Sequence, residues 1–505
     1  MSNVWGGQWV ADRLRLRLAA GSPASPLALA DLVGLALRRN PRRAHLLVST
    51  VLGKHVPTDP AIVYGAGRLL GALAADRVAG RDSGVAAAGT LLLRSALQGS
   101  PDAAAKLLAT CAEHADNPPA DWAAVIESVT VLGYAETATA LGHAVADALG
   151  ADYLHSTRRH PPGVPEAGRF EEEHSHATRH LLLPEDATML ARSGPLLLVD
   201  DELSTGQTAL NTIVALHSRA PRPRYVIATL VDLRSAADRA RMASVAASLG
   251  AEISVVALAE GHLELPPDAA SIGKQLVADH DHDRPTDPPA GRTTPRRLPL
   301  TGWHGVREGG RHGFNHHDRA ALRAATGRVA AQAAGLLTGD RVLVLGFEEL
   351  MYAPLLIAQR LKDLLPDTVD IRFSSTTRSP VVAVDEPGYA IRTRLTFRSH
   401  DDPADGPGPR FAYNVAPGSD PGRRFTDILV IVDDAGDTAS LHAPGGLLDQ
   451  LTGCCDQVHL LALPSHLPLP EPTPCPPVTP SIPACQNRSA DQPLAATTPM
   501  RWPGS

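Results

Sequence analysis

Two adjacent carboxylates followed by a hydroxyl-rich turn form the stretch of the sequence best suited to chemistry. The segment LLLVDDELSTGQTAL runs from Leu196 to Leu210 and places Asp200 and Asp201 directly after four apolar residues. Such an apolar run is typical of a buried parallel strand, and ligands of open α/β sheets bind at the carboxyl ends of strands. Carboxylates at that edge can accept hydrogen bonds from two sugar hydroxyls, or hold a divalent cation through water.

The turn after these acids is suited to an anion. It consists of Ser204, Thr205, Gly206, Gln207 and Thr208, and a helix is expected to begin among them. Amides at a helix N-terminus cradle a phosphate, and the neighbouring hydroxyls add donors. One ligand that carries hydroxyls and a phosphate on the same ring would therefore use the acids and the turn together. The alternative is a capped helix that follows two incidental acids.

A second turn, earlier in the chain, is a candidate for another anion. The stretch VLGYAETAT predicts a strand, a turn and then a helix that begins at Thr137. The turn itself consists of Gly133, Tyr134, Ala135 and Glu136. Its backbone amides could bind the oxygens of an anion. The alternative is an ordinary strand-to-helix connection in which Glu136 favours the helix dipole.

Residues 156–184, between the two turns, are rich in Pro, His and Glu and are expected to form a long loop or hairpin. Arg158, His174 and His176 lie in this segment. A solvated loop and a zinc site completed by His180 are two interpretations of these residues. Lys54, which follows an earlier apolar run, either contacts a base or lies in solvent.

Taken together, these motifs resemble the type I phosphoribosyltransferases, whose phosphoribosyl pyrophosphate loop has four apolar residues, two acids and a Thr-Gly-x-Thr turn. A narrower resemblance comes from RRNPRRAHLLVSTVLGKHVPTDP, GYAETATALGHAVADAL, FEEEHSHATRHLLLP and VDDELSTGQTALNTI, in that order. These stretches are similar to the phosphoribosyltransferases found with bacterial tellurium-resistance gene clusters. Such proteins carry a carboxyl-terminal domain named for a Thr-Arg-Ser-Pro motif, which stands here at residues 377–380.

The resemblance implies an enzyme that joins phosphoribosyl pyrophosphate to a nitrogenous base, with Asp200 and Asp201 as catalytic groups that also hold Mg²⁺ through water. It places the 5′-phosphate at the turn of residues 204–208 and pyrophosphate at the turn of residues 133–137. It also implies that residues 156–184 close over the site, with Arg158 meeting pyrophosphate and with His174 and His176 lining the closed loop. Synthesis or salvage of a nucleotide-like metabolite in a stress response is the implied role. A non-catalytic sensor of phosphoribosyl pyrophosphate or a nucleotide, signalling through the second domain, is the alternative. A homodimer, a pseudo-dimer of the two halves and partners from the same gene cluster all stay open.

The elements that must position these groups are those of an α/β fold. Strands alternate with helices over residues 8–278, which predicts a mostly parallel sheet. A polar, Pro-rich linker is expected at 279–300, a second α/β domain at 301–465, and a disordered Pro-rich tail at 466–505. Near the start, strict alternation predicts a strand at 13–18, and helical spacing predicts a helix at 27–40.

The second domain echoes the first but loses its phosphate turn. VLVLGFEELMYAP repeats the strand and Gly-aromatic turn, and VDDAGDTASL keeps Asp433 and Asp434 without the Ser-Thr-Gly sequence. This order indicates an internal duplication with a degenerate second copy. A cluster of hydroxyls and one guanidinium in that copy suits an anion and comprises Thr376, Thr377, Arg378 and Ser379. The loop HGVREGGRHGFNHHD, at 304–318, is expected to be solvated.

Composition excludes several classes of function. The formal net charge of −7 gives no electrostatic case for binding nucleic acid or an anionic membrane. The five cysteines lack metal-ligand spacing, the first residues lack the apolar core of a signal peptide, and no run approaches about 18 apolar residues. A cytoplasmic location is therefore expected.

Overall fold

The computed structural model describes residues 4–21, 27–39, 43–161, 163–171, 179–281, 293–401 and 408–468. Met1–Pro468 form one compact unit. The tail after Pro468 lies outside the described residues, and the domain boundaries expected from the sequence stay predictions. Among the described residues, no helix combines the length and the apolar character needed to span a membrane.

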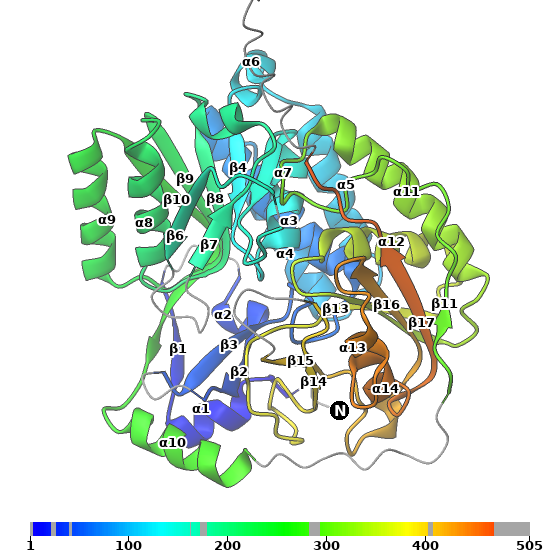
Figure 1. Cartoon of the computed structure of the whole chain (residues 1–505). Helices are drawn as coiled ribbons and strands as arrows, with labels where there is room; N and C mark the ends of the chain where they lie inside the picture. The colour runs from blue at the N-terminus through cyan, green and yellow to red at the C-terminus, as the bar shows by residue number, and fades with distance from the viewer. Residues whose placement is uncertain are drawn as a thin grey trace, which may run out of the picture. The chain divides into compact units, whose positions relative to one another are not determined.

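A six-stranded sheet carries the first part of the chain, in the order β1-β10-β9-β8-β4-β5 (Figure 1). All neighbouring pairs are parallel except β1 with β10. Its strands are β1 (Arg17–Ala20), β4 (Thr130–Gly133), β5 (Asp152–His155), β8 (Leu196–Leu203), β9 (Arg224–Asp232) and β10 (Glu252–Glu264). The apolar half of β8, Leu196 to Val199, is fully buried.

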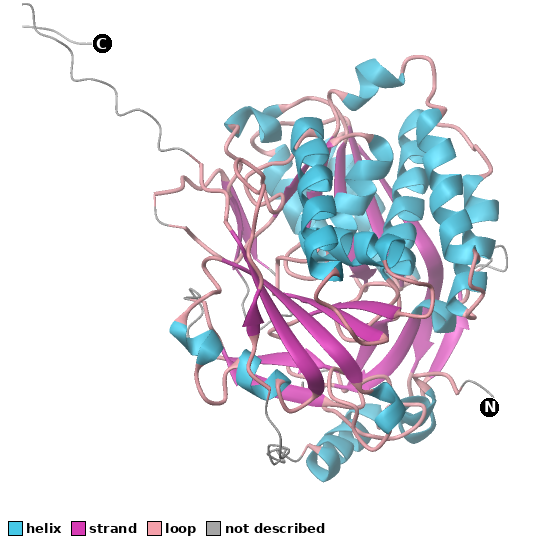
Figure 2. Ribbon diagram, turned by 90° about the vertical axis from the view of Figure 1, so that its right-hand side faces the viewer, coloured by secondary structure: helices cyan, strands magenta, loops and turns pink. Residues whose placement is uncertain are grey.

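Eight helices of this part accompany the sheet in the described chain between residues 60 and 280. They are α3 (Pro60–Ala79), α4 (Val85–Leu97), α5 (Ala103–Asp116), α6 (Trp122–Ile126), α7 (Thr139–Leu149), α8 (Gln207–His217), α9 (Ala236–Leu249) and α10 (Ala269–His280). A 3₁₀ turn, η1 (Ala187–Ala191), precedes β8. Strands lie against helices throughout (Figure 2), and the predicted α/β class is confirmed.

The second part repeats this plan with a parallel sheet in the order β11-β17-β16-β12-β13. Its elements are β11 (Arg296–Arg297), α11 (His316–Ala334), β12 (Arg341–Gly346), α12 (Tyr352–Leu364), β13 (Asp370–Ser375), η2 (Pro421–Arg423), β16 (Phe425–Asp433), α13 (Ala439–His442), α14 (Leu447–Leu451) and β17 (Cys455–Leu463). The order β17-β16-β12-β13 matches β9-β8-β4-β5 of the first sheet. The expected second α/β domain of similar plan is therefore confirmed.

Three hairpins complete the fold and are β2 (Val33–Leu37) with β3 (His45–Ser49), β6 (Gly168–Glu171) with β7 (Arg179–Leu182), and β14 (Arg394–Arg398) with β15 (Pro409–Tyr413). The last two stand at the same place in the two parts, each between the strand after the Gly-aromatic turn and the strand that ends in the acids. One strand of each of these two hairpins pairs with a threonine. Leu181 of β7 pairs with Thr157, and Phe411 of β15 pairs with Thr377.

Two expectations near the N-terminus are wrong. The predicted strand at 13–18 is divided, because α1 (Gln8–Leu14) covers its start and β1 begins only at Arg17. The predicted helix at 27–40 shrinks to one turn, α2 (Leu29–Leu32), and β2 follows at once. β2 is buried along its whole length and pairs with β3. Tertiary pairing has overridden helical spacing in a segment that is apolar on all sides.

Each part of the chain also extends the sheet of the other. The segment before α3 pairs with the edge strand β13 through Thr58 and Phe373, with amide-to-carbonyl distances of 3.0 and 2.8 Å. In the same way, the segment before α11 pairs with the edge strand β5 through Phe314 and Tyr153, at 2.8 and 2.9 Å. Both sheet edges are thereby covered by backbone from the other half.

Candidate functional site

The carboxylate pair lies in the last part of β8. Asp200 pairs with Thr229 of β9, and both Asp200 and Asp201 are half-buried. The amide of Asp201 donates to the Asp200 carboxylate at 2.9 Å. Burial raises the pKa of Asp201, although the nearby Lys54 ammonium opposes that rise. Two carboxylates in such surroundings favour a bound cation or hydroxyl donors.

The hydroxyl-rich turn follows as expected, and α8 begins at Gln207. Gly206 caps this helix with φ +76°, a left-handed conformation that strains any side-chain-bearing residue. The amide of Gln207 donates to Thr205 Oγ1 at 3.3 Å. The turn residues Ser204, Thr205, Gln207 and Thr208 are half-buried. Amides in the first turn of a helix have no acceptor within that helix, so this turn presents donors at the sheet edge.

The first turn emerges at the same edge, because β4 and β8 are neighbouring parallel strands with Gly133 opposite Val199. The Tyr134 amide donates to the Val199 carbonyl at 3.1 Å. A Cβ on Gly133 would lie 2.3 Å from the Tyr153 hydroxyl, so only glycine fits there. α7 begins at Thr139 instead of Thr137, and residues 135–138 form a turn with a cis peptide bond between Ala135 and Glu136.

Lys54 contacts the turn that follows β4. Its side chain is buried, which rules out the solvated alternative. Nζ donates to Thr137 Oγ1 at 2.7 Å and lies 3.3 Å from Glu136 Oε1, and its charge reaches Asp201. The sequence offered only a weak signal for this role, because Lys54 lies far from both motifs along the chain.

Glu136 is buried and ionised. Burial opposes its ionisation, but the charges of Lys54 and Arg158 and a hydrogen bond from Thr377 outweigh that cost and lower its pKa to about 2. Thr377 Oγ1 donates to Glu136 Oε1, and the Arg378 amide donates to the same oxygen at 3.4 Å. The second half of the chain therefore contacts the first turn directly.

Two family models match this chain, in the order of its two sheets. The first is described as Phosphoribosyl transferase and matches residues 32–262, which include both turns and the acids. The second is described as TRSP domain C terminus to PRTase_2 and matches residues 308–451. Residues 32–262 therefore belong to this family of phosphoribosyltransferases, and residues 308–451 belong to the TRSP family. The resemblance to phosphoribosyltransferases that carry a carboxyl-terminal TRSP domain is thus confirmed, and the link to tellurium-resistance gene clusters stays a prediction.

Solved structures similar to this phosphoribosyltransferase include adenine phosphoribosyltransferases. The Giardia lamblia protein, complexed with 9-deazaadenine, is 22% identical, with a TM-score of 0.23 over 34% of this chain and 85% of that one. The protein from Rhodothermus marinus is 21% identical, with a TM-score of 0.19 over 26% of this chain and 69% of that one. TM-scores this low do not bear on substrate or mechanism. No curated protein matches.

The acids of the TRSP domain are engaged by the protein itself. Asp433, at the end of β16, is fully buried and forms an ion pair with Arg159 of the phosphoribosyltransferase domain. Arg159 also lies 3.1 Å from Asp401. Further along, Asp437 forms an ion pair with Arg297 at 2.7 Å. A guanidinium thus pairs with Asp433 of the second copy, where the phosphate turn is absent.

The hydroxyl cluster of the TRSP domain faces protein carboxylates and amides. Thr376 and Thr377 are fully buried. Thr376 Oγ1 accepts from the Glu348 amide at 3.2 Å, and Arg378 Nε donates to Glu348 Oε2 at 2.6 Å. The anion site expected at 376–379 stays a prediction, and an anion would have to compete with these contacts.

The expected lid is described only in part. His174 and His176 lie outside the described residues, between β6 and β7. His180, on β7, is buried against the Ser156 hydroxyl at 2.9 Å. In the described ranges, no group of three or more His, Cys, Asp or Glu side chains could hold a metal ion. Arg158 lies at this end of β5, where its charge reaches Glu136.

The loop at 304–318 is solvated only in part, because His304, His316 and His317 are exposed as expected but its middle is buried. Glu308, Arg311 and His312 are buried, because the loop pairs with β5 through the His155 amide and the Gly310 carbonyl, at 3.1 Å. Arg311 Nη2 lies 3.3 Å from Glu349 Oε2. The histidine-rich composition misled the interpretation, since strand pairing with a distant segment leaves no local signal.

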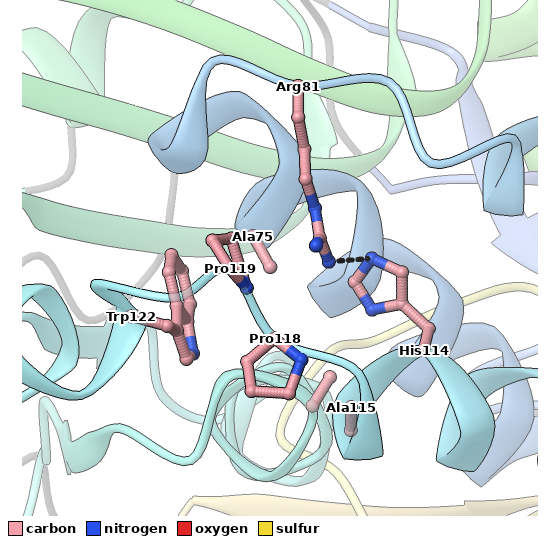
Figure 3. Close-up of a pocket in the computed structure, with 8 residues that line it drawn as sticks. Ala75, Arg81, His114, Ala115, Pro118, Pro119 and Trp122 are labelled. Atoms are coloured by element: carbon pink, nitrogen blue, oxygen red, sulfur yellow. Dashed lines mark hydrogen bonds between the residues drawn. The ribbon is translucent and has the colours of Figure 1, made fainter.

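A small hollow lies away from these turns (Figure 3). It is lined by Ala75, Arg81, His114, Ala115, Pro118, Pro119, Trp122 and Ala148. Arg81 contacts His114 at 3.1 Å, and both contact Asp76. Ala148 stands at the C-terminal end of α7, whereas the first turn precedes its N-terminus. The hollow is therefore separate from the candidate active site.

Proposed function

We propose that this phosphoribosyltransferase moves the phosphoribosyl group from phosphoribosyl pyrophosphate to a nitrogenous base, with Mg²⁺ bound. The observation that carries the proposal is the meeting of the two candidate turns at the carboxyl ends of the adjacent strands β4 and β8. Asp200 and Asp201 lie in the last part of β8, and Lys54 contacts the turn that follows β4. Ligands bind at such strand ends in open α/β sheets.

Each group has a role in this proposal. Asp200 and Asp201 accept hydrogen bonds from the ribose hydroxyls, while the first turn of α8 binds the 5′-phosphate. The turn at Gly133–Thr137 and Lys54 bind pyrophosphate. The bond between the anomeric carbon and pyrophosphate breaks with its electron pair on the leaving oxygen, and a lone pair of the base nitrogen forms the new bond. Positive charge that develops on the sugar is stabilised by the carboxylates.

The residues present fit Mg²⁺. This ion usually takes one or two carboxylates together with substrate phosphates and water, rather than a cage made by the protein alone. Asp200 and Asp201 supply such a pair, half-buried in the last part of β8. When bound, the ion would neutralise charge on the pyrophosphate group.

The proposal is tested by replacing both acids with Asp200→Asn and Asp201→Asn. Turnover, followed as pyrophosphate release in a screen of bases, should fall by about 100-fold or more, because preorganised charge at the reacting centre is lost. Circular dichroism should show an unchanged fold. The matched control is Asp434→Asn, at the equivalent exposed position of the second copy, which should keep wild-type turnover. Full activity in the double variant contradicts the proposal.

A second candidate is a sensor, favoured by the contact between Glu136 of the pyrophosphate turn and Thr377 of the TRSP domain. Such a contact can report occupancy of the turn to the second domain. A sensor predicts that phosphoribosyl pyrophosphate raises the melting temperature without base-dependent release of pyrophosphate. Synthesis or salvage of a nucleotide-like metabolite under stress is the metabolic role we propose for the enzyme, on the motif resemblance alone.

A further inference from the structure

The two halves exchange equivalent contacts at their Gly-aromatic turns. Thr377 Oγ1, after β13, donates to Glu136 in the turn after β4. Conversely, Thr157 Oγ1, after β5, donates to Glu349 in the turn after β12, at 2.7 Å. Backbone amides follow the same pattern, since the Arg378 amide donates to Glu136 at 3.4 Å and the Arg158 amide donates to Glu349 at 2.8 Å.

Each glutamate also has a cation from its own half. Lys54 lies 3.3 Å from Glu136, and Arg311 lies 3.3 Å from Glu349. Both cations come from the segment that pairs with the edge strand of the other sheet. Glu136 and Glu349 are therefore each held by a threonine hydroxyl and an arginine amide from the opposite half, and by a cation from their own half. Only the Glu136 set stands next to a phosphate turn.

The second copy differs at one further position. The Arg159 amide donates to Thr157 Oγ1 at 3.0 Å, and the Ser379 amide donates to Thr377 Oγ1 at 3.2 Å. Arg159 and Ser379 therefore occupy equivalent positions in the two halves. Arg159 reaches from the phosphoribosyltransferase domain into the acids of the second copy. The TRSP motif has the shorter Ser379 at that position. The TRSP motif thus keeps the threonine and the arginine that contact Glu136. It has no arginine at the position from which Arg159 pairs with Asp433.

We propose that Thr377 of the TRSP motif is a positioning residue for the pyrophosphate turn of the phosphoribosyltransferase domain. The inference rests on the proposed function, because it assigns pyrophosphate to the turn that Glu136 belongs to. Thr377 and the Arg378 amide donate to Glu136 Oε1, so that the carboxylate charge is shared among several donors. The Lys54 ammonium can then still bind an anion, and its hydrogen bond to Thr137 fixes the direction of the lysine side chain.

Loss of the Thr377 hydroxyl would remove one of the donors that share the charge of Glu136. Glu136 is buried, and a charge-assisted hydrogen bond to such a carboxylate is stronger than one between neutral groups. Without it, Glu136 draws more strongly on Lys54, and the ammonium becomes a weaker ligand for pyrophosphate. The second domain therefore supports the active site by holding a side chain of the first domain, without touching the substrate.

The test compares three variants of the full chain, Thr377→Val, Thr377→Ser and Thr157→Val. Calorimetry measures the affinity for inorganic pyrophosphate with Mg²⁺, and steady-state kinetics measure KM and kcat for phosphoribosyl pyrophosphate. Thr377→Val should weaken pyrophosphate binding by about tenfold, the usual effect of losing one hydrogen bond to a charged group. Thr377→Ser keeps the hydroxyl and should restore binding. Thr157→Val removes the equivalent bond in the second copy and should leave pyrophosphate binding unchanged.

The outcomes separate this inference from the proposed function. Wild-type affinity in Thr377→Val overturns the inference, and so does an equal loss in Thr157→Val, because both results reduce Thr377 to an interface contact. Wild-type protein that binds pyrophosphate without turnover contradicts the proposed transfer reaction, yet the affinities of the variants still decide the role of Thr377. Wild-type protein that binds no pyrophosphate overturns the inference as well.

Discussion

Glu308 is a buried carboxyl whose protonation couples folding to pH. It lies in the loop that pairs with β5, is 5% exposed, and accepts from the His466 amide at 2.8 Å. Burial raises its pKa from 4.5 to about 7, although Arg311, at 3.7 Å, opposes the rise. The folded state thus binds a proton more tightly than the unfolded state does. Its contribution to stability is full below pH 4.5 and is lost as the pH rises to about 7.

Glu308→Gln should remove this dependence, because the amide mimics the protonated carboxyl. Relative to wild type, the free energy of unfolding of the variant should rise between pH 5 and pH 8 by about 1–3 kcal/mol, within the limit that the shift allows. Urea unfolding at the two pH values measures it. The comparison between the two proteins cancels the titration of the buried histidines. Parallel pH profiles for both proteins would contradict the assigned burial of the charge.

Single residues could be read from the sequence where a local motif carries the chemistry. Asp200 and Asp201 lie near the end of a strand, and Gly206 precedes a helix, as an apolar run, adjacent acids and a glycine indicate locally. The sequence alone leaves the surroundings of Lys54 open between a base and solvent, because its partner Thr137 is 83 residues away. Nothing in its own neighbourhood reports that distant contact.

At the scale of elements, the strand-turn-helix of β8 and α8 was predictable, whereas the N-terminal segments were not. Periodicity distinguishes helix from strand only when one face is polar. The segment at 32–37 is apolar without interruption, and its pairing with β3 decides for a strand. The edge pairing of Thr58 with Phe373 is another contact that periodicity does not encode.

Gly206→Ala should separate helix capping from phosphate binding. The alanine would have to adopt a left-handed φ of +76°, and its Cβ would lie 3.0 Å from the Met242 methyl. The substitution should therefore cost about 1–2 kcal/mol of stability. It should also weaken binding of ribose 5-phosphate, because the turn shifts. The control is Gly250→Ala, at the C-cap of α9, which has φ +61° and open space around it.

Thermal unfolding and calorimetric titration measure both glycine variants. Gly250→Ala should lose a similar amount of stability, since the backbone strain is alike, and keep the affinity for ribose 5-phosphate. Equal affinities in Gly206→Ala and wild type would show that the turn does not hold the phosphate.

At the scale of the whole molecule, buried charges are shared across the two domains. Glu136 and Thr377 are 241 residues apart, and Arg159 reaches Asp433 across 274 residues. The sequence indicated the duplication through repeated motifs but could not indicate which side chains the copies exchange. Equivalent motifs are visible in one dimension, whereas their reciprocal pairing depends on how two sheets pack.

Asp147 of α7 is the clearest example of this sharing. Its buried carboxylate accepts from Tyr64 of α3 at 2.6 Å and from Tyr352 of α12, and it forms ion pairs with Arg319 and Arg323 of α11. Burial opposes ionisation, but the arginines outweigh it, so the pKa of Asp147 is lowered. Helices of both domains therefore depend on one charge.

We expect Met1–Pro468 to unfold in one cooperative transition, although chains of this length often show several. The described residues form one compact unit, and opening either domain alone would expose Asp147, Glu136 and Glu349 without their partners. Asp147→Asn should destabilise that transition by about 3 kcal/mol, the usual cost of breaking a buried charge pair, without dividing it. Differential scanning calorimetry measures both proteins. Two resolved transitions in the wild type would mean that the domains fold independently, and the shared charges would then contribute little to the cohesion of the molecule.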